Sequence, residues 1–331
     1  MLSKPADAIP RGDGWLYEPK WDGFRALVFR AGDAVHLASR NELPLERYFP
    51  DVVEVVKGCL PERCVVDGEI VIPGERGLDF DALQLRLHPA ASRVKKLSEE
   101  IPASFIAFDV LHDGADDLRE APLHQRRARL EAMLRGSKRC FVTPQTDDPD
   151  EAAAWFERFE GAGLDGLIAK HRDLRYEPGE RVMVKIKHQR TADCVVAGYR
   201  LNKSRDGVGS LVLGVYGDGG EMHHLGFTST FKAAERRELL TQLQPLVRGV
   251  RDGGPPSRWT QGKDTSWTEI EPGLVCEVAF DHLQGGWRFR HGARFVRWRA
   301  DKDPKDCTFD QFVEPEPFAL EDIRALAERD A

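Results

Sequence analysis

The 331-residue chain predicts an α+β fold divided into two domains, the second of them a small β-barrel. Three observations support this prediction. The length exceeds what one hydrophobic core usually organises. The first half alternates strands and helices without the regular βαβ rhythm of a parallel sheet. The second half contains short strand candidates separated by glycine-containing turns, with one helix among them, which indicates a barrel of the OB-fold type.

The first half begins with a predicted hairpin. Phe24–Phe29 (FRALVF) and Ala34–Ala38 (AVHLA) flank an Ala-Gly-Asp turn, which is typical of two paired antiparallel strands. Runs of β-branched and aromatic residues predict four further strands, at Cys64–Pro73, Phe105–Leu111, Asp165–Lys170 and Val182–His188. Helices are expected at Leu123–Leu134 and at Asp150–Phe159, the second beginning at Asp150 and ending before Gly161 and Gly163.

The second half consists mainly of short strands. Five segments have this character: Cys194–Arg200, Ser210–Tyr216, Glu221–Phe227, Leu274–His282 and Arg294–Arg299. A helix is expected over Ala233–Leu246, and the Pro/Gly-rich stretch Arg251–Pro256 is interpreted as a loop. We place the domains at residues 1–190 and 191–313, followed by an acidic tail, 314–331, with a helix over Leu320–Arg329.

Composition narrows the class of protein. Hydrophobic residues make up 41% and charged residues 31% of the chain, as in soluble globular proteins. No apolar stretch is long enough to span a bilayer and no signal peptide is recognisable, so we expect no membrane partner. The six cysteines form no CxxC pair and have no histidine at zinc-site spacing, which indicates reduced, mostly buried thiols and a cytoplasmic location.

Net charge argues mildly against a nucleic-acid partner, but the charge is unevenly distributed. The chain carries −7 at pH 7. Residues 286–305, in contrast, interleave aromatic residues with the cations Arg288, Arg290, Arg294, Arg297, Arg299, Lys302 and Lys305. This pattern is typical of a surface for a phosphate-rich partner, and equally of an amphipathic strand with a solvated basic face. The pattern alone leaves both interpretations open.

Ionisable residues occupy positions in or beside the predicted strands where a plain core strand has none. They are Lys20, Asp22, Arg25, Arg40, Asp67, Glu69, Asp109, Asp165, Lys170, Lys185 and Lys187. For any one pair, the simplest interpretation is an edge-strand charge that discourages aggregation. The whole set is better explained by convergence on one polyphosphate ligand with a divalent metal. The chain has neither a P-loop nor a GxGxxG that opens a helix, so the two common nucleotide-binding folds are not supported.

Lys20 is the candidate nucleophile in this set. An amine that attacks the α-phosphorus of a nucleoside triphosphate forms a phosphoramidate and expels pyrophosphate. A free lysine, with a pKa near 10.4, is almost entirely ammonium at neutral pH. Neighbouring cations and a bound metal favour the neutral amine. The candidates for this field are Arg25, Arg40, Lys185, Lys187 and Mg²⁺, with Glu69 and Asp165 available to the metal or the ribose.

Seven blocks, in order, resemble the motifs of the covalent nucleotidyltransferase superfamily, which comprises ATP-dependent DNA ligases, RNA ligases and mRNA capping enzymes. KWDGFR at Lys20–Arg25 resembles the KxDGxR motif that carries the lysine nucleophile. The later blocks are SRN at Ser39–Asn41, VDGEIV at Val66–Val71, FIAFDVL at Phe105–Leu111, DGLIAK at Asp165–Lys170, VKIK at Val184–Lys187 and RFVRWRADKDP at Arg294–Pro304. The resemblance covers nearly the whole chain and is greatest to bacterial stand-alone ATP-dependent DNA ligases.

The resemblance implies an antiparallel-sheet, ATP-grasp-like nucleotidyltransferase domain followed by an OB-fold domain. It implies ATP, held as AMP on Lys20, and Mg²⁺ or Mn²⁺ bound by Glu69 and Asp165, with Asp22 and Arg25 beside Lys20 in catalysis. At the nucleoside, the implied contacts are Glu18 at the adenine edge, Phe108 stacked on adenine, and Arg25 and Glu69 at the ribose. At the phosphates, they are Arg40, Lys185 and Lys187, with Lys170 also in the pocket. Pyrophosphate is implied to contact Arg297, Arg299 and Lys302.

Two positions depart from the family pattern. Asp165 stands where ligases commonly have Glu, and its side chain is one methylene shorter, so a bridging water to the metal is as compatible as direct contact. Glu42 follows the SRN block where Gly is frequent, which leaves the conformation of that turn open. Because Lys20 lies close to the N-terminus, we also expect no large DNA-binding domain before it.

The resulting expectation is an ATP-dependent DNA ligase that seals 3′-OH/5′-phosphate nicks in double-stranded DNA during repair. A monomer in the bacterial cytoplasm, with a repair polymerase or primase or a Ku-like end-binding protein as partner, fits this interpretation. An RNA ligase, or another covalent nucleotidyltransferase that uses the same lysine, is the alternative. A catalytically inactive DNA-binding scaffold is disfavoured by the presence of Lys20, Glu69, Lys185 and Lys187.

Overall fold

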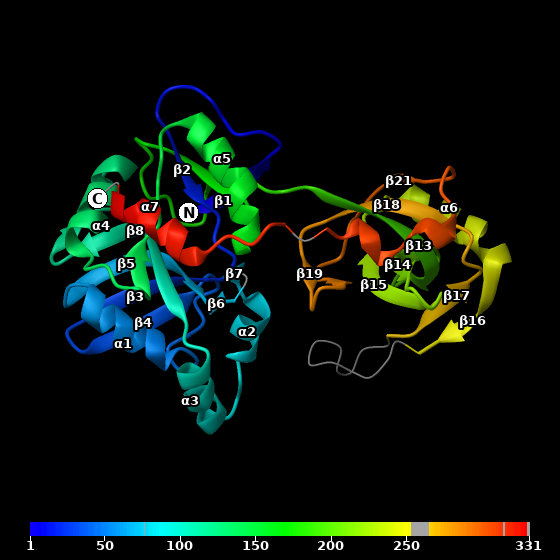
Figure 1. Ribbon diagram of the computed structural model, residues 1–331, viewed down its shortest axis with the longest axis horizontal. Coiled ribbons are helices and arrows are strands. Elements are labelled where there is room, and N and C mark those ends of the chain that lie inside the picture. The colour runs from blue at the N-terminus through cyan, green and yellow to red at the C-terminus, as the bar shows by residue number, and fades with distance from the viewer. Residues whose placement is uncertain (76, 253–264, 314, 330–331) are drawn as a thin grey trace. The chain divides into compact units, whose positions relative to one another are not determined.

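The computed structural model describes residues 1–75, 77–252, 265–313 and 315–329, which divide into two compact units (Figure 1). Unit 1 comprises Met1–Lys187 together with the C-terminal segment that follows Val313, and unit 2 comprises His188–Val313. The division falls just before the boundary expected at residues 190 and 191. Unit 2 is therefore an insertion in the sequence of unit 1, and the chain passes between the two units twice.

A four-stranded sheet forms one layer of unit 1, with the strand order β1-β12-β11-β2. Its strands are β1 (Leu2–Ala6), β2 (Trp15–Pro19), β11 (Leu167–His171) and β12 (Arg181–Ile186). β1 runs parallel to β12, and the other two pairs are antiparallel. In the β11–β2 pair, Ile168 lies opposite Glu18 and Lys170 opposite Leu16, so Lys170 and Glu18 are diagonal neighbours on one face.

A second sheet of unit 1 has the order β10-β8-β5-β3-β4, with the short strand β9 on β8. Its strands are β3 (Phe24–Ala31), β4 (Ala34–Ser39), β5 (Arg63–Val71), β8 (Ser104–Asp113), β9 (Asp116–Asp117) and β10 (Cys140–Val142). The expected hairpin is confirmed, because β3 and β4 pair from Ala26 with Ser39 to Ala31 with Ala34. Of the pairs in this sheet, β10 with β8 is parallel. A two-stranded ribbon, β6 (Pro73–Gly74) with β7 (Gly77–Leu78), lies beside it in sequence.

Helices cover these sheets (Figure 1). They are α1 (Pro50–Cys59), α2 (Phe80–Leu85), α3 (Ala91–Glu100), α4 (Leu123–Met133), α5 (Pro149–Phe159) and α7 (Leu320–Arg329), with the 3₁₀ turn η1 (Glu160–Ala162). Val52 and Val56 of α1 are fully buried in the hydrophobic core against the second sheet, in the same cluster as Phe105 of β8. α5 begins one residue earlier than expected, because the Asp148 side chain accepts a hydrogen bond from the Asp150 amide and Pro149 occupies the first turn.

The C-terminal segment packs on unit 1. Ile323 of α7 is fully buried in the cluster that contains Trp155 and Phe159 of α5. The Phe318 ring lies 5.5 Å from the Phe159 ring, and the Arg158 guanidinium lies 5.0 Å from the Phe318 ring centroid. The helix has the bounds expected from the sequence, whereas its burial against α5 was not expected.

Unit 2 is built on one long strand. β13 pairs with β14, β17 and β18 along its length, and the sheet continues through β15, β16 and β21. The elements are β13 (Arg190–Leu201), β14 (Val208–Tyr216), β15 (Met222–Thr228), α6 (Ala233–Leu243), η2 (Gln244–Leu246), β16 (Val247–Arg251), β17 (Trp267–Ile270), β18 (Val275–Phe280), β19 (Leu283–Gln284), β20 (Arg288–Phe289), β21 (Arg294–Trp298), η3 (Pro304–Asp306) and η4 (Phe309–Gln311). Leu239 and Leu243 of α6 are buried against the core of this sheet.

The five strands expected in the second half are present, with shifts at their ends. The sequence did not indicate β16 and β17, which form an additional antiparallel pair. The expected helix over 233–246 ends as an α-helix at Leu243 and continues as a 3₁₀ turn. Of the expected loop 251–256, Arg251 ends β16, and residues 253–256 lie outside the described part of the chain.

Two expectations from composition concern the whole chain. All six cysteines are buried and unpaired, as expected for reduced thiols. Among the described residues, no helix combines the length and the apolar character needed to cross a membrane.

Candidate active site

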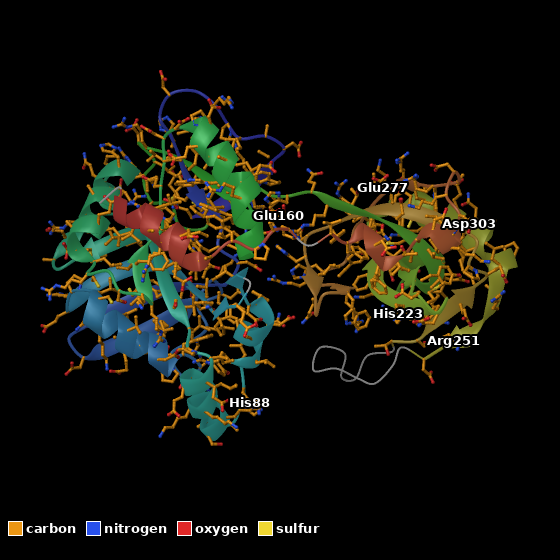
Figure 2. All side chains as sticks on the ribbon, in the orientation of Figure 1. His88, Glu160, His223, Arg251, Glu277 and Asp303 are labelled. Atoms are coloured by element: carbon orange, nitrogen blue, oxygen red, sulfur yellow. The ribbon has the colours of Figure 1, made fainter. Side chains whose placement is uncertain are left out.

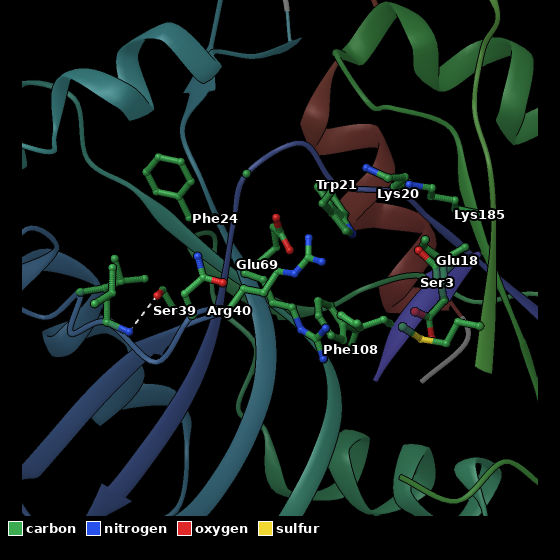
Figure 3. Close-up of a pocket in the computed structure, with 18 of the residues that line it drawn as sticks. Ser3, Glu18, Lys20, Trp21, Phe24, Ser39, Arg40, Glu69, Phe108 and Lys185 are labelled. Atoms are coloured by element: carbon green, nitrogen blue, oxygen red, sulfur yellow. Dashed lines mark hydrogen bonds between the residues drawn. The ribbon is translucent and has the colours of Figure 1, made fainter. Parts of the chain in front are cut away.

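Unit 1 contains a pocket of about 860 Å³ between its two sheets. Figure 3 shows Lys20, Arg40, Glu69 and Phe108 around this space. The lining comes from segments that are far apart in sequence, and its charged members are Glu18, Lys20, Arg25, Arg40, Arg47, Glu69, Lys170, Arg181 and Lys185. Of the eleven charged residues expected to converge, six line this pocket: Lys20, Arg25, Arg40, Glu69, Lys170 and Lys185. The combined cations and carboxylates suit a phosphorylated ligand.

Lys20 directly follows the last residue of β2, and two backbone hydrogen bonds hold it in place. Its amide donates to the Gly166 carbonyl at 2.8 Å, and its carbonyl accepts from the Asp165 amide at 2.9 Å. Gly166 has φ +117°, and a Cβ there would lie 2.0 Å from the Ile186 carbonyl oxygen, so only glycine fits. These contacts place the Asp165 carboxylate against the Lys20 amine, with which it forms a salt bridge.

Asp165 binds a second lysine as well. Lys187 Nζ lies 2.9 Å from Asp165 Oδ2, the same oxygen that contacts Lys20. Asp165 is only 6% exposed, so the two cations share a buried carboxylate. Lys185, two residues before Lys187, lines the pocket. The sequence pattern that placed Lys185 and Lys187 on one side is thus consistent with both lying near Lys20.

Gly23, inside the KWDGFR block, allows β3 to run close to β5. A Cβ at Gly23 would lie 2.2 Å from the Ile70 carbonyl oxygen and 2.9 Å from Glu69 Cγ. Asp22, just before it, is not among the residues that line the pocket in the described structure. Its charge acts on the site through Glu69, whose pKa it helps to raise.

Arg25 is oriented by Asp67. Arg25 Nε and Nη2 donate to the two Asp67 oxygens at 3.0 Å and 2.5 Å, and the Tyr176 hydroxyl donates to Asp67 Oδ2 at 2.8 Å. The guanidinium also donates to the Met1 carbonyl. Arg25 still lines the pocket, but its planar guanidinium is bound in a bidentate manner by the buried Asp67 carboxylate. Asp67 and Tyr176 were not recognised from the sequence as partners of this arginine.

Glu69 lies directly opposite Arg25 in the β3–β5 pair. Burial raises the pKa of Glu69 to about 8; the charges of Lys20 and Arg25 oppose this rise, while Asp67 and Asp22 add to it. A bound cation would favour its carboxylate form. Glu69 is therefore a candidate metal or ribose ligand that changes protonation near neutral pH.

Mg²⁺ typically uses one or two protein carboxylates together with substrate phosphates. Glu69, which lines the pocket, and Asp165, which contacts Lys20, fit this donor set. Within the described residues, no group of three or more His, Cys, Asp or Glu side chains is arranged to hold a metal by itself. A metal that is shared between these residues and a polyphosphate is compatible with this arrangement.

Phe108, Lys170 and Glu18 form one corner of the pocket. Phe108 is half-buried, whereas its neighbours Ala107 and Asp109 on β8 are fully buried, so its ring faces the pocket. Lys170 Nζ lies 5.0 Å from the ring centroid and 2.6 Å from Glu18 Oε2. Lys170 itself is 2% exposed.

Arg40 follows the last residue of β4, and Arg40 and the turn after it line the pocket. Glu42 has φ +59°, a left-handed conformation that favours glycine. The Glu42 amide donates to the Ser39 carbonyl at 2.8 Å, and the Leu43 amide donates to Ser39 Oγ at 3.0 Å. The turn thus keeps the shape that glycine would give it, with glutamate in the strained position.

The cations of the last motif are paired inside unit 2. Arg297 Nε lies 2.6 Å from Glu277 Oε2; Glu277 is labelled on β18 in Figure 2. Arg299 contacts Asp193 at 3.0 Å and Asp301 at 2.8 Å, and Lys302 Nζ lies 3.1 Å from Asp193 Oδ2. The hydrogen bonds that Arg299 donates to Asp301 raise the pKa of Arg299 above its ordinary value. Asp193 was not singled out in the sequence.

Several pocket residues were missed in the sequence. Arg181 and Met183 alternate with Lys185 on β12, and all three line the pocket. Extending the period-2 pattern of Lys185 backwards would have found them. Leu2 and Ser3 of β1 also line the pocket, and Gln145 contacts Glu18. No local signal marks these residues, because their position depends on how the strands pair.

The chain matches two family models of known proteins. Residues 1–187 match the ATP dependent DNA ligase domain, and residues 204–302 match the ATP dependent DNA ligase C terminal region. Among relatives, it is 52% identical to DNA ligase C2 of Mycolicibacterium smegmatis, over 95% of this chain and 94% of that protein. It is 49% identical to DNA ligase C of Mycobacterium tuberculosis, over 98% and 96%.

A likeness in fold extends to a solved structure of a Lig E DNA ligase. That structure is similar to this one with a TM-score of 0.58 and 20% identity, over 90% of this chain and 98% of that chain. Together with the family models, this likeness confirms the expected order of a nucleotidyltransferase domain followed by an OB-fold domain.

Proposed function

The chain belongs to the family of ATP-dependent DNA ligases, and on that premise we propose that it seals 3′-OH/5′-phosphate nicks through an AMP bound covalently to Lys20. The observation that carries this proposal is the position of Lys20. Its amine lies at a pocket of about 860 Å³, in contact with a carboxylate that also binds a second lysine.

The chemistry has three balanced steps. The Lys20 amine loses a proton and attacks the α-phosphorus of ATP, so that a P–N bond forms and the bond to pyrophosphate breaks. The 5′-phosphate of the nick then attacks the same phosphorus, which transfers AMP to DNA and returns the lysine. The 3′-OH finally attacks the 5′-phosphate, and AMP leaves.

The pocket residues have distinct parts in this scheme. Asp165 holds the Lys20 amine and is the acceptor nearest to its proton. Lys185, Lys187 and Arg40 supply positive charge for the α-phosphate, and Phe108 supplies a ring for the base. Glu69 and Asp165 would hold Mg²⁺ or Mn²⁺, which neutralises developing charge on the phosphates when bound. Arg25, fixed by Asp67, and Glu69 would meet the ribose, with Asp22 tuning Glu69 through its charge.

The remaining expectations belong to the same proposal. Nicked double-stranded DNA is the macromolecular substrate, and Arg297, Arg299 and Lys302 act on pyrophosphate in the first step. A bacterial cytoplasmic location, a monomeric state and a repair polymerase, primase or Ku-like partner stay predictions. Family membership supports DNA as the substrate most directly.

The test uses Lys20→Ala in both half-reactions. Labelled ATP should transfer AMP to the wild type and not to the variant, and the variant should fail to seal an ordinary nick. A nick that already carries 5′-AMP should still be sealed by the variant at a reduced rate, because the last step needs no free lysine. Transfer of label to the variant, in a bond stable to hydroxide, would show that another residue is the nucleophile.

Two controls complete this experiment. Lys4→Ala removes an exposed lysine of β1 and should leave both half-reactions unchanged. GTP and nicked RNA serve as the competing substrates, because an RNA ligase would seal nicked RNA at least as well as nicked DNA. A protein that labels with ATP and seals only RNA would refute the DNA ligase assignment.

A further inference from the structure

We propose that Cys59 and Cys140 are a peroxide-sensitive thiol pair, in which a hydroperoxide oxidises Cys59 and Cys140 then closes a disulfide that fastens α1 to β10. Cys59 is the last residue of α1, and Cys140 is the first residue of β10. Neither residue is among those that line the pocket of unit 1 in the described structure. The inference therefore does not depend on the proposed function.

The fold brings these two cysteines together although they are far apart in sequence. The segment that leads into β10 passes the end of α1, where the Arg135 amide donates to the Cys59 carbonyl at 2.8 Å. Ser137 Oγ lies 3.4 Å from Cys59 Sγ and accepts from the Cys140 amide at 3.1 Å. The two thiols are also hydrogen-bonded to each other. The sulfur atoms therefore lie within reach of each other, as disulfide formation requires.

The two thiols differ in a way that sets the order of reaction. Cys59 is 6% exposed, whereas Cys140 is fully buried, so a peroxide molecule reaches Cys59 first. The hydrogen bond with Cys140 lowers the pKa of Cys59 to about 6; burial opposes this change and the bond with Ser137 adds to it. The same contact, together with burial, raises the pKa of Cys140. Because the thiolate is the nucleophile, Cys59 attacks the peroxide and Cys140 resolves the product.

The chemistry consumes one hydroperoxide for each disulfide. The Cys59 thiolate attacks one oxygen of hydrogen peroxide, so that an S–O bond forms, the O–O bond breaks and hydroxide leaves to become water. The Cys140 sulfur then attacks the sulfenic sulfur of Cys59. An S–S bond forms, the S–O bond breaks, and the Cys140 proton leaves with the hydroxide as a second water. The two thiols lose two electrons in total, which reduce the peroxide.

Cys194 and Cys276 of unit 2 provide an internal comparison. They lie directly opposite each other in the β13–β18 pair, and both are fully buried. Burial is the main cause that raises the pKa of both thiols, to about 12 for Cys276. These two cysteines are neighbours, but they have neither the access nor the thiolate that reaction with a peroxide needs. We therefore expect them to stay reduced under conditions that join Cys59 to Cys140.

The experiment treats the folded protein with hydrogen peroxide and then blocks the remaining thiols with N-ethylmaleimide in denaturant. Peptide mapping by mass spectrometry, with and without reduction by dithiothreitol, identifies the cysteines that are joined. Cys140→Ser is treated in the same way in the presence of dimedone, which traps sulfenic acids. Cys276→Ser is the matched control, because it also removes a buried strand cysteine that has a cysteine neighbour. Thermal unfolding of the wild type is recorded before and after oxidation.

The expected result is one disulfide, between Cys59 and Cys140, in the wild type and in Cys276→Ser. In Cys140→Ser, dimedone should label Cys59 about tenfold more than in the wild type, because no thiol remains beside it to resolve the sulfenic acid. The oxidised wild type should unfold at a higher temperature than the reduced protein, since the bond closes a long loop of the chain. Dithiothreitol should reverse this increase.

The opposing results are equally definite. If peroxide leaves Cys59 as a thiol, or converts it to sulfinic acid with no disulfide to Cys140, the proposal is wrong. It is also wrong if Cys194 and Cys276 are joined as fast as Cys59 and Cys140, or if the oxidised protein unfolds no later than the reduced one. These measurements use the wild type, so they decide the question even where Cys140→Ser fails to fold.

Discussion

Each unit of this protein contains a carboxylate, buried or nearly so, that holds two cations. In unit 1, Asp165 binds Lys20 and Lys187. In unit 2, Asp193 binds Arg299 and Lys302, at 3.0 Å and 3.1 Å. The side-chain exposures are similar, at 8% for Asp165 and 12% for Asp193. The ion pairs alone therefore do not distinguish the Asp165 site from the Asp193 site.

The difference lies in residue type and in the space beside the pair. Lys20 can lose a proton and attack phosphorus, whereas the guanidinium of Arg299 stays charged and can only bind. Lys20 lines a pocket of about 860 Å³, while Arg299 and Lys302 line one of about 240 Å³. In the proposed function, the same electrostatic unit would serve covalent chemistry in unit 1 and charge presentation in unit 2.

The most direct way to break the comparison is to neutralise both carboxylates. Asp165→Asn should reduce labelling by ATP about a hundredfold or more, because the amine loses its holder and nearest proton acceptor. Asp193→Asn should affect labelling much less and should lower the midpoint of thermal unfolding of unit 2. Measuring labelling rates and unfolding of both variants checks this. Equal effects on labelling would mean that the two carboxylates serve the same purpose.

Removing the cations of unit 2 sharpens the comparison. The double change Arg299→Ala and Lys302→Ala should slow labelling by ATP and leave sealing of pre-adenylated nicks comparatively intact, because pyrophosphate leaves only in the first step. Arg297→Ala should behave similarly to a smaller degree. Both half-reactions are measured across salt concentration. Equal losses in the two steps, with a reduced salt slope of DNA binding, would instead identify a DNA-facing surface.

The carboxylates near these pairs also differ in how they respond to pH. Burial raises the pKa of Glu69 to about 8, from an ordinary value of 4.5, whereas hydrogen bonds from Arg299 lower the pKa of Asp301 to about 2. The folded state holds the Glu69 proton more tightly than the unfolded state does, so its contribution to stability falls as pH rises from 4.5 to about 8.

Glu69→Gln should therefore flatten the decline in stability over that range. Urea unfolding of the wild type and the variant at pH 5 and pH 8, without nucleotide, measures the change. Asp301→Asn is the matched control, because the carboxylate of Asp301 titrates well below this window in both states. A decline of equal size in the wild type and in Glu69→Gln would assign the pH dependence to other groups.

The smallest expected effect concerns backbone strain, which again occurs once in each unit. Of the described non-glycine residues, Glu42 and Arg205 have positive φ, at 59° and 60°. Glycine relieves the strain but adds entropy to the unfolded chain, so each change to glycine should stabilise by up to about 1 kcal/mol. Denaturant midpoints of Glu42→Gly and Arg205→Gly test this. Destabilisation of both would mean that side-chain contacts outweigh the strain at these turns.

The residues of the site were largely predictable, but their partners were not. Alternation and residue type placed Glu69, Phe108 and Lys185 on strands that do line the pocket. The contact of Lys170 with Glu18 depends on the register of β11 against β2, and that of Arg25 with Asp67 on the register of β3 against β5. Register is set by the whole fold, so local sequence patterns do not predict it.

Some elements of the fold were missed for physical reasons. Pro50–Cys59 contains four valines and has the composition of a strand, yet it forms α1 because Val52, Val56 and Cys59 lie on one buried face. Tertiary packing here overrides local propensity. β1 contains Pro5 and becomes a strand by pairing in parallel with β12 at the edge of its sheet.

The return of the C-terminal segment to unit 1 has a consequence for the nascent chain. Ile323 is fully buried in the cluster that contains Trp155 and Phe159, but the ribosome reaches it only after all of unit 2. At ordinary translation rates, that interval lasts on the order of ten seconds. Unit 2 can complete its own core within this time, while unit 1 still exposes the apolar surface that α7 will cover. The unit that begins the chain is thus the last to finish folding, and a product truncated before Ile323 presents that surface to chaperones and proteases.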